Sequence, residues 1–434
     1  MRKTKIFMTV SALILSSCSS GSWFGEKDKV PHPGKRESIL ILDKQLEVSK
    51  ELQKIAISVP KQVPNNLWNV SGVNQNGVVP QNIALGKSLH KERDIRLTGS
   101  SYSGHFKRVA PIILNDKIYI LNSSEVRAYD INSSKLLWAK MVGDQKSKRT
   151  FGGGLLAQGN VLYVTSGGKE LAALDISDGN ILWKYSLSNV SRSAPNIFGE
   201  NLYVQTIDNK LYAIDRSKGS LLWFHQGPVE AINSMKYPSV FANQNIVVAA
   251  YGSGDIYFLA PQNGGEFLQI ELANNSIIGQ GVSLKNIEST PVVEGDRVFA
   301  INNEGVIICL DLTNGTTIWK QEIIGFKNMW LAGDFIYLLN PNGEIISIYK
   351  KTGKIKWVNH ISFAKGDKPA ISGPVMAGDR LLISFESGQI LEISPYDGKV
   401  LNKLDAGART SGFPIIVNEK LYSLTDSGNL VVFK

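Results

Sequence analysis

Cysteine is nearly absent from this sequence of 434 residues, which contains only two. Two cysteines cannot build a disulfide framework or a cysteine-rich metal site. Long hydrophobic runs are also missing, because the one candidate, residues 6–15, is too short to cross a bilayer core of about 30 Å. With 43% hydrophobic and 20% charged residues, the composition excludes a membrane bundle and a disordered chain. What remains is a folded protein with a large core.

Blocks of like charge are missing too, although the formal net charge is +9. Three of the positive charges, Arg2, Lys3 and Lys5, lie in a leader that we expect to be removed, which lowers the charge of the mature chain. The other lysines and arginines are scattered and do not alternate with aromatic residues. We therefore expect a soluble surface with a modest positive excess and no nucleic-acid partner.

The N-terminus has the organisation of a secretory signal peptide. Residues 1–17 combine a basic start with the apolar run 6–15. The run ends in Leu-Ser-Ser-Cys at 15–18, which resembles the lipobox of bacterial lipoproteins. That resemblance implies cleavage before Cys18, acylation of its thiol and of the new amine, and, because Ser19 is not Asp, sorting to the outer membrane. Since several acyl chains give stable attachment, we predict a lipid-anchored protein on the periplasmic face of the outer membrane.

Residues 18–65 are expected to form a lipidated tether and an N-terminal arm. The first part is small and polar, and a Pro-His-Pro-Gly run breaks any regular element. Residues 36–57 mix apolar and charged positions without one clear period, which leaves both a short strand and a short helix open. Pro60 and Pro64 then bracket an extended approach to Trp68.

The rest of the chain, residues 66–434, repeats one unit: Ala-Leu-Asp-x-x-x-Gly-x-x-Leu-Trp. The unit is clearest at 173–183 and 213–223, and more degenerate copies lie on both sides of these. A second apolar segment, often with a Pro before it, precedes each copy, and turn pairs such as Asp178-Gly179 separate the short strands. The period of about 40 to 50 residues is that of a four-stranded propeller blade.

Counting the units gives eight blades, whose third strands are expected at Val126, Leu171, Leu211, Ile256, Val306, Ile345, Ile390 and Leu430. The last unit stops at Lys434 and lacks an outer strand. We expect the segment around Trp68, residues 67–70, to supply that strand, which closes the ring and removes an exposed edge. The predicted fold is all-β: a single eight-bladed β-propeller of four-stranded antiparallel blades, with the last blade closed by an N-terminal strand.

The repeated Trp and Asp residues have two interpretations. Taken singly, a Trp could stack on a ligand and an Asp could be catalytic. At the same position of unit after unit, however, a Trp is expected to pack between adjacent blades and an Asp to accept hydrogen bonds within a turn. We favour the structural role for both sets.

Motifs for catalysis and for cofactor or metal binding are missing. The five histidines are scattered, which disfavours a zinc site, and neither a phosphate-binding loop nor a nucleophile elbow is present. The glycine run at 152–154 leads into a strand and is interpreted as a tight approach to an inner strand. Cys309 alternates with apolar neighbours, as a buried structural thiol does. We predict no catalytic residue, no cofactor and no metal.

The repeats resemble the PQQ-like propeller repeat, which occurs in quinoprotein dehydrogenases and in non-enzymatic lipoproteins. With the lipobox, the eight blades and the N-terminal closing strand, the sequence from about Gly34 to Lys434 resembles the BamB lipoprotein family of the outer-membrane β-barrel assembly (Bam) machinery. The resemblance implies a non-enzymatic scaffold that binds the POTRA region of BamA within the Bam complex and assists folding and insertion of β-barrel proteins. Unfolded outer-membrane proteins are a further candidate partner.

In that family, loops near the third and fourth blades bind BamA. One contact run, Leu-x-Leu-Arg shortly before an inner-strand Pro, corresponds here to the stretch with Ile232 and Asn233 before Pro238. The second, Asp-x-Asp before Thr-Pro-Val-Val, corresponds to the stretch with Asn286 and Glu288. The resemblance therefore implies these two residue pairs as partner-binding positions, with the family's Arg and one of its acids replaced by Asn.

Two alternative functions stay open. One is a PQQ-dependent dehydrogenase-like enzyme, which the lack of a vicinal cysteine pair disfavours. The other is a propeller scaffold of a different envelope complex.

Overall fold

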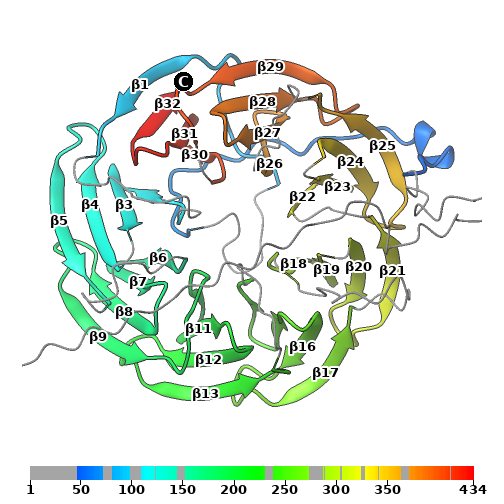
Figure 1. Cartoon of the computed structure of the whole chain (residues 1–434). Helices are drawn as coiled ribbons and strands as arrows, with labels where there is room; N and C mark the ends of the chain where they lie inside the picture. Colours follow the sequence, from blue (N-terminus) through cyan, green and yellow to red (C-terminus); the bar gives the residue numbers. More distant parts are fainter. Residues whose placement is uncertain are drawn as a thin grey trace, which may run out of the picture. The chain divides into compact units, whose positions relative to one another are not determined.

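The repeated sequence unit folds into a four-stranded antiparallel blade, and eight such blades form the ring seen in Figure 1. The structure, a computed structural model, describes residues 46–71, 81–97, 109–122, 124–143, 152–229, 238–272, 287, 289–303, 305–323, 328–340, 342–362, 371–410 and 412–434. No helix within these ranges has the length and apolar character that crossing a bilayer requires. The predicted all-β, eight-bladed propeller of four-stranded antiparallel blades is confirmed.

Seven blades take their four strands in chain order, from the inside of the ring to its rim (Figure 1). Blades 1 to 4 consist of β2 (Ile112–Leu114), β3 (Lys117–Asn122), β4 (Glu125–Asp130), β5 (Leu136–Met141); β6 (Gly154–Gln158), β7 (Val161–Thr165), β8 (Glu170–Asp175), β9 (Ile181–Ser186); β10 (Asn196–Phe198), β11 (Asn201–Thr206), β12 (Lys210–Asp215), β13 (Leu221–Gln226); and β14 (Phe241–Ala242), β15 (Val247–Ala250), β16 (Asp255–Leu259), β17 (Glu266–Glu271). Blades 5 to 7 consist of β18 (Val292–Glu294), β19 (Arg297–Ile301), β20 (Val306–Asp311), β21 (Thr317–Glu322); β22 (Asn328–Ala332), β23 (Phe335–Leu339), β24 (Glu344–Tyr349), β25 (Ile355–His360); and β26 (Ile371–Ala377), β27 (Arg380–Phe385), β28 (Gln389–Ile393), β29 (Val400–Asp405). Blade 8 contains β30 (Ile415–Val417), β31 (Lys420–Leu424), β32 (Leu430–Phe433) and β1 (Lys91–Ile95).

The core lies between the blades. All eight residues that we expected on third strands lie on the third strand of their blade, from Val126 in β4 to Leu430 in β32. The second and third strands are almost wholly buried, as in β11 and β12, whereas an outer strand such as β9 alternates between exposed and half-buried residues. Side chains of neighbouring blades share each apolar cluster, as Leu114 of blade 1 and Ile176 of blade 2 do. Apolar packing between neighbouring blades therefore contributes to the stability of each blade.

The ring is closed by an N-terminal strand, as predicted, but the predicted segment was wrong. The edge of β32 is taken by β1, in which Ile95 pairs with Leu430, and the backbone of His90 exchanges hydrogen bonds with that of Lys434. Trp68, which we expected there, pairs instead with Ile113 on the innermost strand of blade 1. The physical reason is that closure needs a backbone edge and a buried apolar residue, which Ile95 supplies, and does not need a tryptophan.

Arg93 stands in for the missing tryptophan of blade 8. It pairs with Val432 across the sheet, the register that Trp138 has with Ala128 in blade 1. Its guanidinium donates to the carbonyl oxygen of Ile131 at 3.1 Å, in the place where other blades use an indole N–H. The flexible, positively charged side chain of Arg93 thus joins the last blade to the first.

The repeated tryptophans pack between adjacent blades, which confirms their structural interpretation. Each indole N–H donates at 2.7–3.2 Å to a carbonyl oxygen of the next blade: Trp138 to Ile176, Trp183 to Arg216, Trp223 to Pro261, Trp319 to Lys350 and Trp357 to Pro395. The ring covers the repeat glycine of that next blade, where an added Cβ would come within 2.5–2.6 Å of ring atoms. Each of these glycines also has a left-handed φ of 71–75°. The Trp of one unit and the Gly of the next unit are therefore in contact across the boundary between two blades, which explains why both residues recur.

The repeated aspartates act within turns, as interpreted from the sequence. In each, Oδ1 accepts the backbone N–H of a residue two or three positions further on, at 2.7–2.9 Å: Asp130 from Ser133, Asp175 from Ser177, Asp215 from Ser217 and Asp311 from Thr313. Hydrogen bonds from the hydroxyl and the backbone of these partners hold the pKa of all four carboxyls below the ordinary value of 3.8. The carboxylates stabilise the turn as anions and have no catalytic partner in it.

The glycine run and the second cysteine also have the expected structural roles. Gly154 begins β6, the innermost strand of blade 2, and an added Cβ there would lie 2.5 Å from Ala194 of blade 3. Cys309 is fully buried on β20, and burial raises the pKa of its thiol to about 11. A thiol with so little thiolate is a packing group and a poor nucleophile.

The arm, residues 46–71 and 81–90, forms backbone bridges to five consecutive blades. It begins with a 3₁₀ turn, η1 (Glu51–Lys54), and is otherwise extended. The bridges join Val48 to Ile355, Ile83 to Ala377, Leu85 to Glu419, Trp68 to Ile113 and Val70 to Leu156, on blades 6, 7, 8, 1 and 2. The arm is thus part of the folded propeller. It pairs with the innermost strands of blades 7, 1 and 2, which have a free edge there, and with the outer strand β25 of blade 6.

Candidate functional site

The sequence places the partner-binding residues in the two connectors that flank blade 4. Ile232 and Asn233 belong to the connector between blades 3 and 4, and Asn286 and Glu288 to the connector between blades 4 and 5. All four lie outside the described residues, and so does Cys18. The structure does describe both ends of each connector, and these ends show how the loops are held.

The ends of the two connectors are joined to one another. The backbone N–H of Ser239, at the end of the 3–4 connector (residues 227–240), donates to Oγ1 of Thr290 at 3.0 Å. Thr290 is at the end of the 4–5 connector (residues 272–291), and Ile287 in that connector is completely buried. The side chain of Asn196 also donates to the carbonyl of Val240. The final residues of both loops are therefore joined to one another, and the end of the 3–4 connector is also held by β10 of blade 3.

Asn209 fixes the beginning of the 3–4 connector. Its side chain is fully buried and donates to the carbonyl oxygen of Pro228 at 2.6 Å, while its Oδ1 accepts the N–H of Gly252 at 2.9 Å. Its own carbonyl accepts the N–H of Gly227 at 2.7 Å. Sequence reasoning missed this residue, because an Asn in a turn is common, and only its left-handed φ of 57° and its burial mark it.

A buried histidine, His225, lies on β13 two residues before the same connector begins. Nδ1 of His225 is 2.6 Å from the hydroxyl oxygen of Tyr251, and Nε2 is 2.8 Å from Oε1 of Glu266. The imidazole also contacts the ring of Tyr257, with centroids 4.8 Å apart. Burial holds the pKa of Tyr251 well above its ordinary value of 10.0 and raises the pKa of Tyr257 to about 12, so both phenols stay protonated. No sequence pattern pointed to this network, since the histidine lies alone in an outer strand.

Chemically, this arrangement can position loops but offers no reactive group. The imidazole of His225 is hydrogen-bonded at both of its nitrogens, and neither it nor the two protonated phenols lies beside a nucleophile. In the described ranges, no cluster of three or more His, Cys, Asp or Glu side chains could hold a metal ion. The site is best described as a pair of connectors with rigid ends on blade 4.

Known proteins resemble this chain in sequence and in fold. A family model described as outer membrane protein assembly factor BamB matches residues 70–359. The BamB of Escherichia coli (strain K12) is 25% identical over 343 residues, which cover 76% of this chain and 86% of that protein. An uncharacterized protein of Rickettsia prowazekii is 25% identical over 59% of this chain, a match that spans 63% of that protein's length.

Solved structures agree on the architecture. The crystal structure of BamB from Moraxella catarrhalis superposes with a TM-score of 0.66 at 19% identity, covering 80% of this chain and 100% of that one. A quinohemoprotein alcohol dehydrogenase from Comamonas testosteroni superposes with a TM-score of 0.65 at 12% identity, covering 88% and 82%. At these identities the likeness concerns the fold alone, which proteins of different function share.

Proposed function

This chain belongs to the family of the outer membrane protein assembly factor BamB, and on that premise we propose that it is a non-enzymatic scaffold of the Bam complex. In this proposal the propeller binds the POTRA region of BamA and assists the folding and insertion of β-barrel proteins into the outer membrane. The observation that carries it is the pair of connectors around blade 4, whose ends are joined by the Ser239–Thr290 hydrogen bond. Loops with rigid ends on a rigid ring suit recognition of a folded partner.

The scaffold role is favoured over a quinone-dependent dehydrogenase by the chemistry of the residues. The sequence has no adjacent cysteines, and burial suppresses the reactivity of Cys309. Beside blade 4, both ring nitrogens of His225 are held in hydrogen bonds within the fold, to Tyr251 and to Glu266. The structural likeness to the alcohol dehydrogenase therefore supports a shared fold, whereas membership of the BamB family supports the scaffold role.

BamA capture tests the connector surface. We expect the double variant Ile232→Asp with Glu288→Lys to recover about five- to tenfold less BamA in a pull-down from detergent-solubilised envelopes. A charge at position 232 would impose a desolvation cost on an apolar contact, and reversal at position 288 would oppose the electrostatic steering of the partner. The matched control, Leu401→Asp with Glu47→Lys, makes the same charge changes at exposed positions of blade 7 and the arm and should recover BamA normally. Undiminished capture by a folded double variant would place the contact elsewhere.

Lipidation of Cys18 is proposed as the anchor to the outer membrane. We expect Cys18→Ala to leave the thermal midpoint unchanged and to move the protein from the membrane fraction to the periplasmic fraction. The reason is that the propeller's described contacts begin at Leu46, well after the proposed acylation site. Cys309→Ala is the matched control and should stay in the membrane fraction. Recovery of Cys18→Ala in membranes after a high-salt wash would contradict the proposal.

A further inference from the structure

The arm shows how this propeller holds an extended segment across a seam between two blades. At blade 6, the carbonyl oxygen of Ser58 lies 2.5 Å from the position that a Cβ on Gly333 would take, and Pro60 lies beside it. Gln62 then donates to a carboxylate oxygen of Asp379, in the corresponding turn of blade 7, at 2.7 Å. The segment is thus held at two successive turns between first and second strands.

The seam between blades 3 and 4 has the same construction. Gly199 has the turn position of Gly333, with a similar left-handed φ of 59° against 55°. Pro261 accepts the indole N–H of Trp223 as Pro395 accepts that of Trp357 at the seam between blades 6 and 7. Among the described residues, however, no atom lies within 4 Å of the position that a Cβ on Gly199 would take. Within the described ranges, the place that the arm fills at Gly333 is thus open at Gly199, as it is at the corresponding Gly159 and Gly295 of blades 2 and 5.

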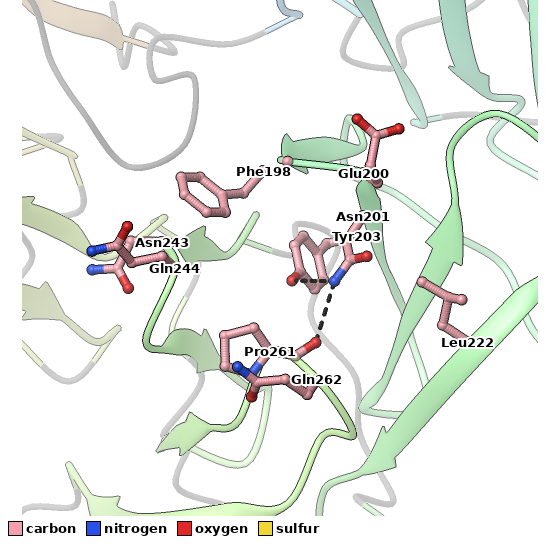
Figure 2. A pocket seen from close by; sticks show the side chains of 10 residues that line it. Phe198, Glu200, Asn201, Tyr203, Leu222, Asn243, Gln244, Pro261 and Gln262 are labelled. Atoms are coloured by element: carbon pink, nitrogen blue, oxygen red, sulfur yellow. Dashed lines mark hydrogen bonds between the residues drawn. The ribbon is translucent and has the colours of Figure 1, made fainter.

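A pocket of about 430 Å³ lies beside Gly199, at this unfilled position (Figure 2). Its apolar walls come from Phe198, Tyr203, Leu222 and Pro261, and the carboxamides of Gln244 and Gln262 stand beside them (Figure 2). Nδ2 of Asn201 donates to the Tyr203 hydroxyl at 3.1 Å and to the Pro261 carbonyl at 3.2 Å, which ties the two blades together at the pocket. The cavity is therefore a feature of a fixed seam.

The lining predicts the chemistry of the ligand. The charged lining residue, Glu200, is paired with Arg216 at 2.8 Å, so the described lining offers no free cation to an anion such as phosphate. Carboxamides both donate and accept hydrogen bonds, as an extended peptide backbone does. Apolar walls with aromatic and proline surfaces suit an aliphatic or proline side chain. These features match those of the arm segment around Pro60, which carries Ile, Val and Pro.

We propose that the pocket between blades 3 and 4 binds an extended segment of another, unfolded polypeptide, rich in aliphatic and proline residues as residues 55–64 are, in the way that the arm occupies the seam between blades 6 and 7. The pocket is distinct from the proposed BamA surface, because the pocket and the connectors lie at opposite ends of the blade strands. Variants in the pocket and in the connectors can therefore fail or succeed independently.

The arm itself supplies the probe, a labelled synthetic peptide of residues 55–64 (IAISVPKQVP). We expect saturable binding to the mature full-length chain in a fluorescence anisotropy titration, with a Kd of about 10⁻⁴ M, because a short flexible segment loses conformational freedom on binding. Leu222→Asp should raise the Kd at least tenfold, since it places a charge in the apolar wall. The matched control is Leu182→Asp at the same outer-strand position of blade 2, exposed to 54% against 48% for Leu222, and it should change the Kd less than twofold.

Three results would overturn the proposal. No saturable binding would remove the site. Equal binding by Leu222→Asp and the parent chain would show that the peptide displaces the arm from its own seam. Self-association of the chain in sedimentation experiments, abolished by Leu222→Asp, would identify the occupant as a second copy of this protein. Circular dichroism and thermal midpoints of both variants ensure that lost binding reflects the pocket.

Discussion

A chain that begins at Thr98 is expected to lose cooperative folding, whereas a chain that begins at Leu46 is expected to keep the thermal midpoint of the mature protein. The longer deletion removes β1 and exposes the whole edge of β32. It also removes Ile95 and Leu97, which are 1% and 3% exposed. Loss of such a side chain typically costs about 2–5 kcal/mol, against a total stability of about 5–15 kcal/mol. Calorimetry and circular dichroism measure the outcome.

An internal deletion of residues 46–75 provides the control for the ring-closing strand. It removes η1 and Trp68 but retains β1, so we expect a lowered midpoint with a cooperative transition. Equal midpoints for the chains that begin at Leu46 and Thr98 would contradict closure by β1. If the chain with the internal deletion unfolded without a cooperative transition, the result would show instead that residues 46–75 of the arm, and not β1, complete the fold.

Trp319→Ala is expected to destabilise the propeller by about 3–5 kcal/mol, the usual cost of removing a buried aromatic side chain. The indole is 8% exposed, donates to the Lys350 carbonyl at 2.7 Å and covers Gly353 of the next blade. The substitution therefore leaves a cavity and removes the shorter of two hydrogen bonds to the Lys350 carbonyl, whose other donor is Arg297 at 3.3 Å. Chemical denaturation measures the change, and Ile318→Ala, at the neighbouring residue that is 41% exposed, should cost little.

A double-mutant cycle separates the seam contact from general loss of packing. Gly353→Ala alone should also destabilise, because its Cβ would lie 2.6 Å from the Trp319 ring and its φ is 71°. In Trp319→Ala with Gly353→Ala the steric part of that cost disappears, so the combined loss should be smaller than the sum of the single losses. Additive losses would mean that the glycine is required for its backbone conformation alone.

The periodic features of this protein could be predicted from the sequence. Each unit carries its own strands and turns, so the eight third strands could be counted from the spacing of the units alone. Trp, Gly and Asp recur because each performs a local task in every blade, such as the Asp175 carboxylate accepting the N–H of Ser177. The repeat also predicts an outer strand for the last blade, and β1 supplies it beside β32.

The candidate site could be predicted only as far as the connectors around blade 4. Asn209 and His225 support those connectors but lie in no motif, because each occurs once. Thr290 belongs to the Thr-Pro-Val-Val stretch, but nothing in that stretch predicts its hydrogen bond with Ser239. Their partners, such as Pro228 for Asn209 and Tyr251 for His225, are 19 and 26 residues away in the chain. A single buried hydrogen bond over such a distance leaves no periodic signal in one sequence.

The sequence alone determined the number of blades and the packing of the repeated Trp between adjacent blades, because both features recur at a fixed spacing in unit after unit. Only the structure showed that each Trp ring covers the repeat Gly of the next blade. Only the tertiary structure decided that β1 and not the segment around Trp68 closes the ring, since Arg93 can replace the indole hydrogen bond to the next blade. It likewise decided which seams the arm covers and that, among the described residues, the pocket beside Gly199 stays open. These outcomes depend on how one extended, non-repeating segment competes for the edges of many similar blades, and that competition is settled by packing in three dimensions.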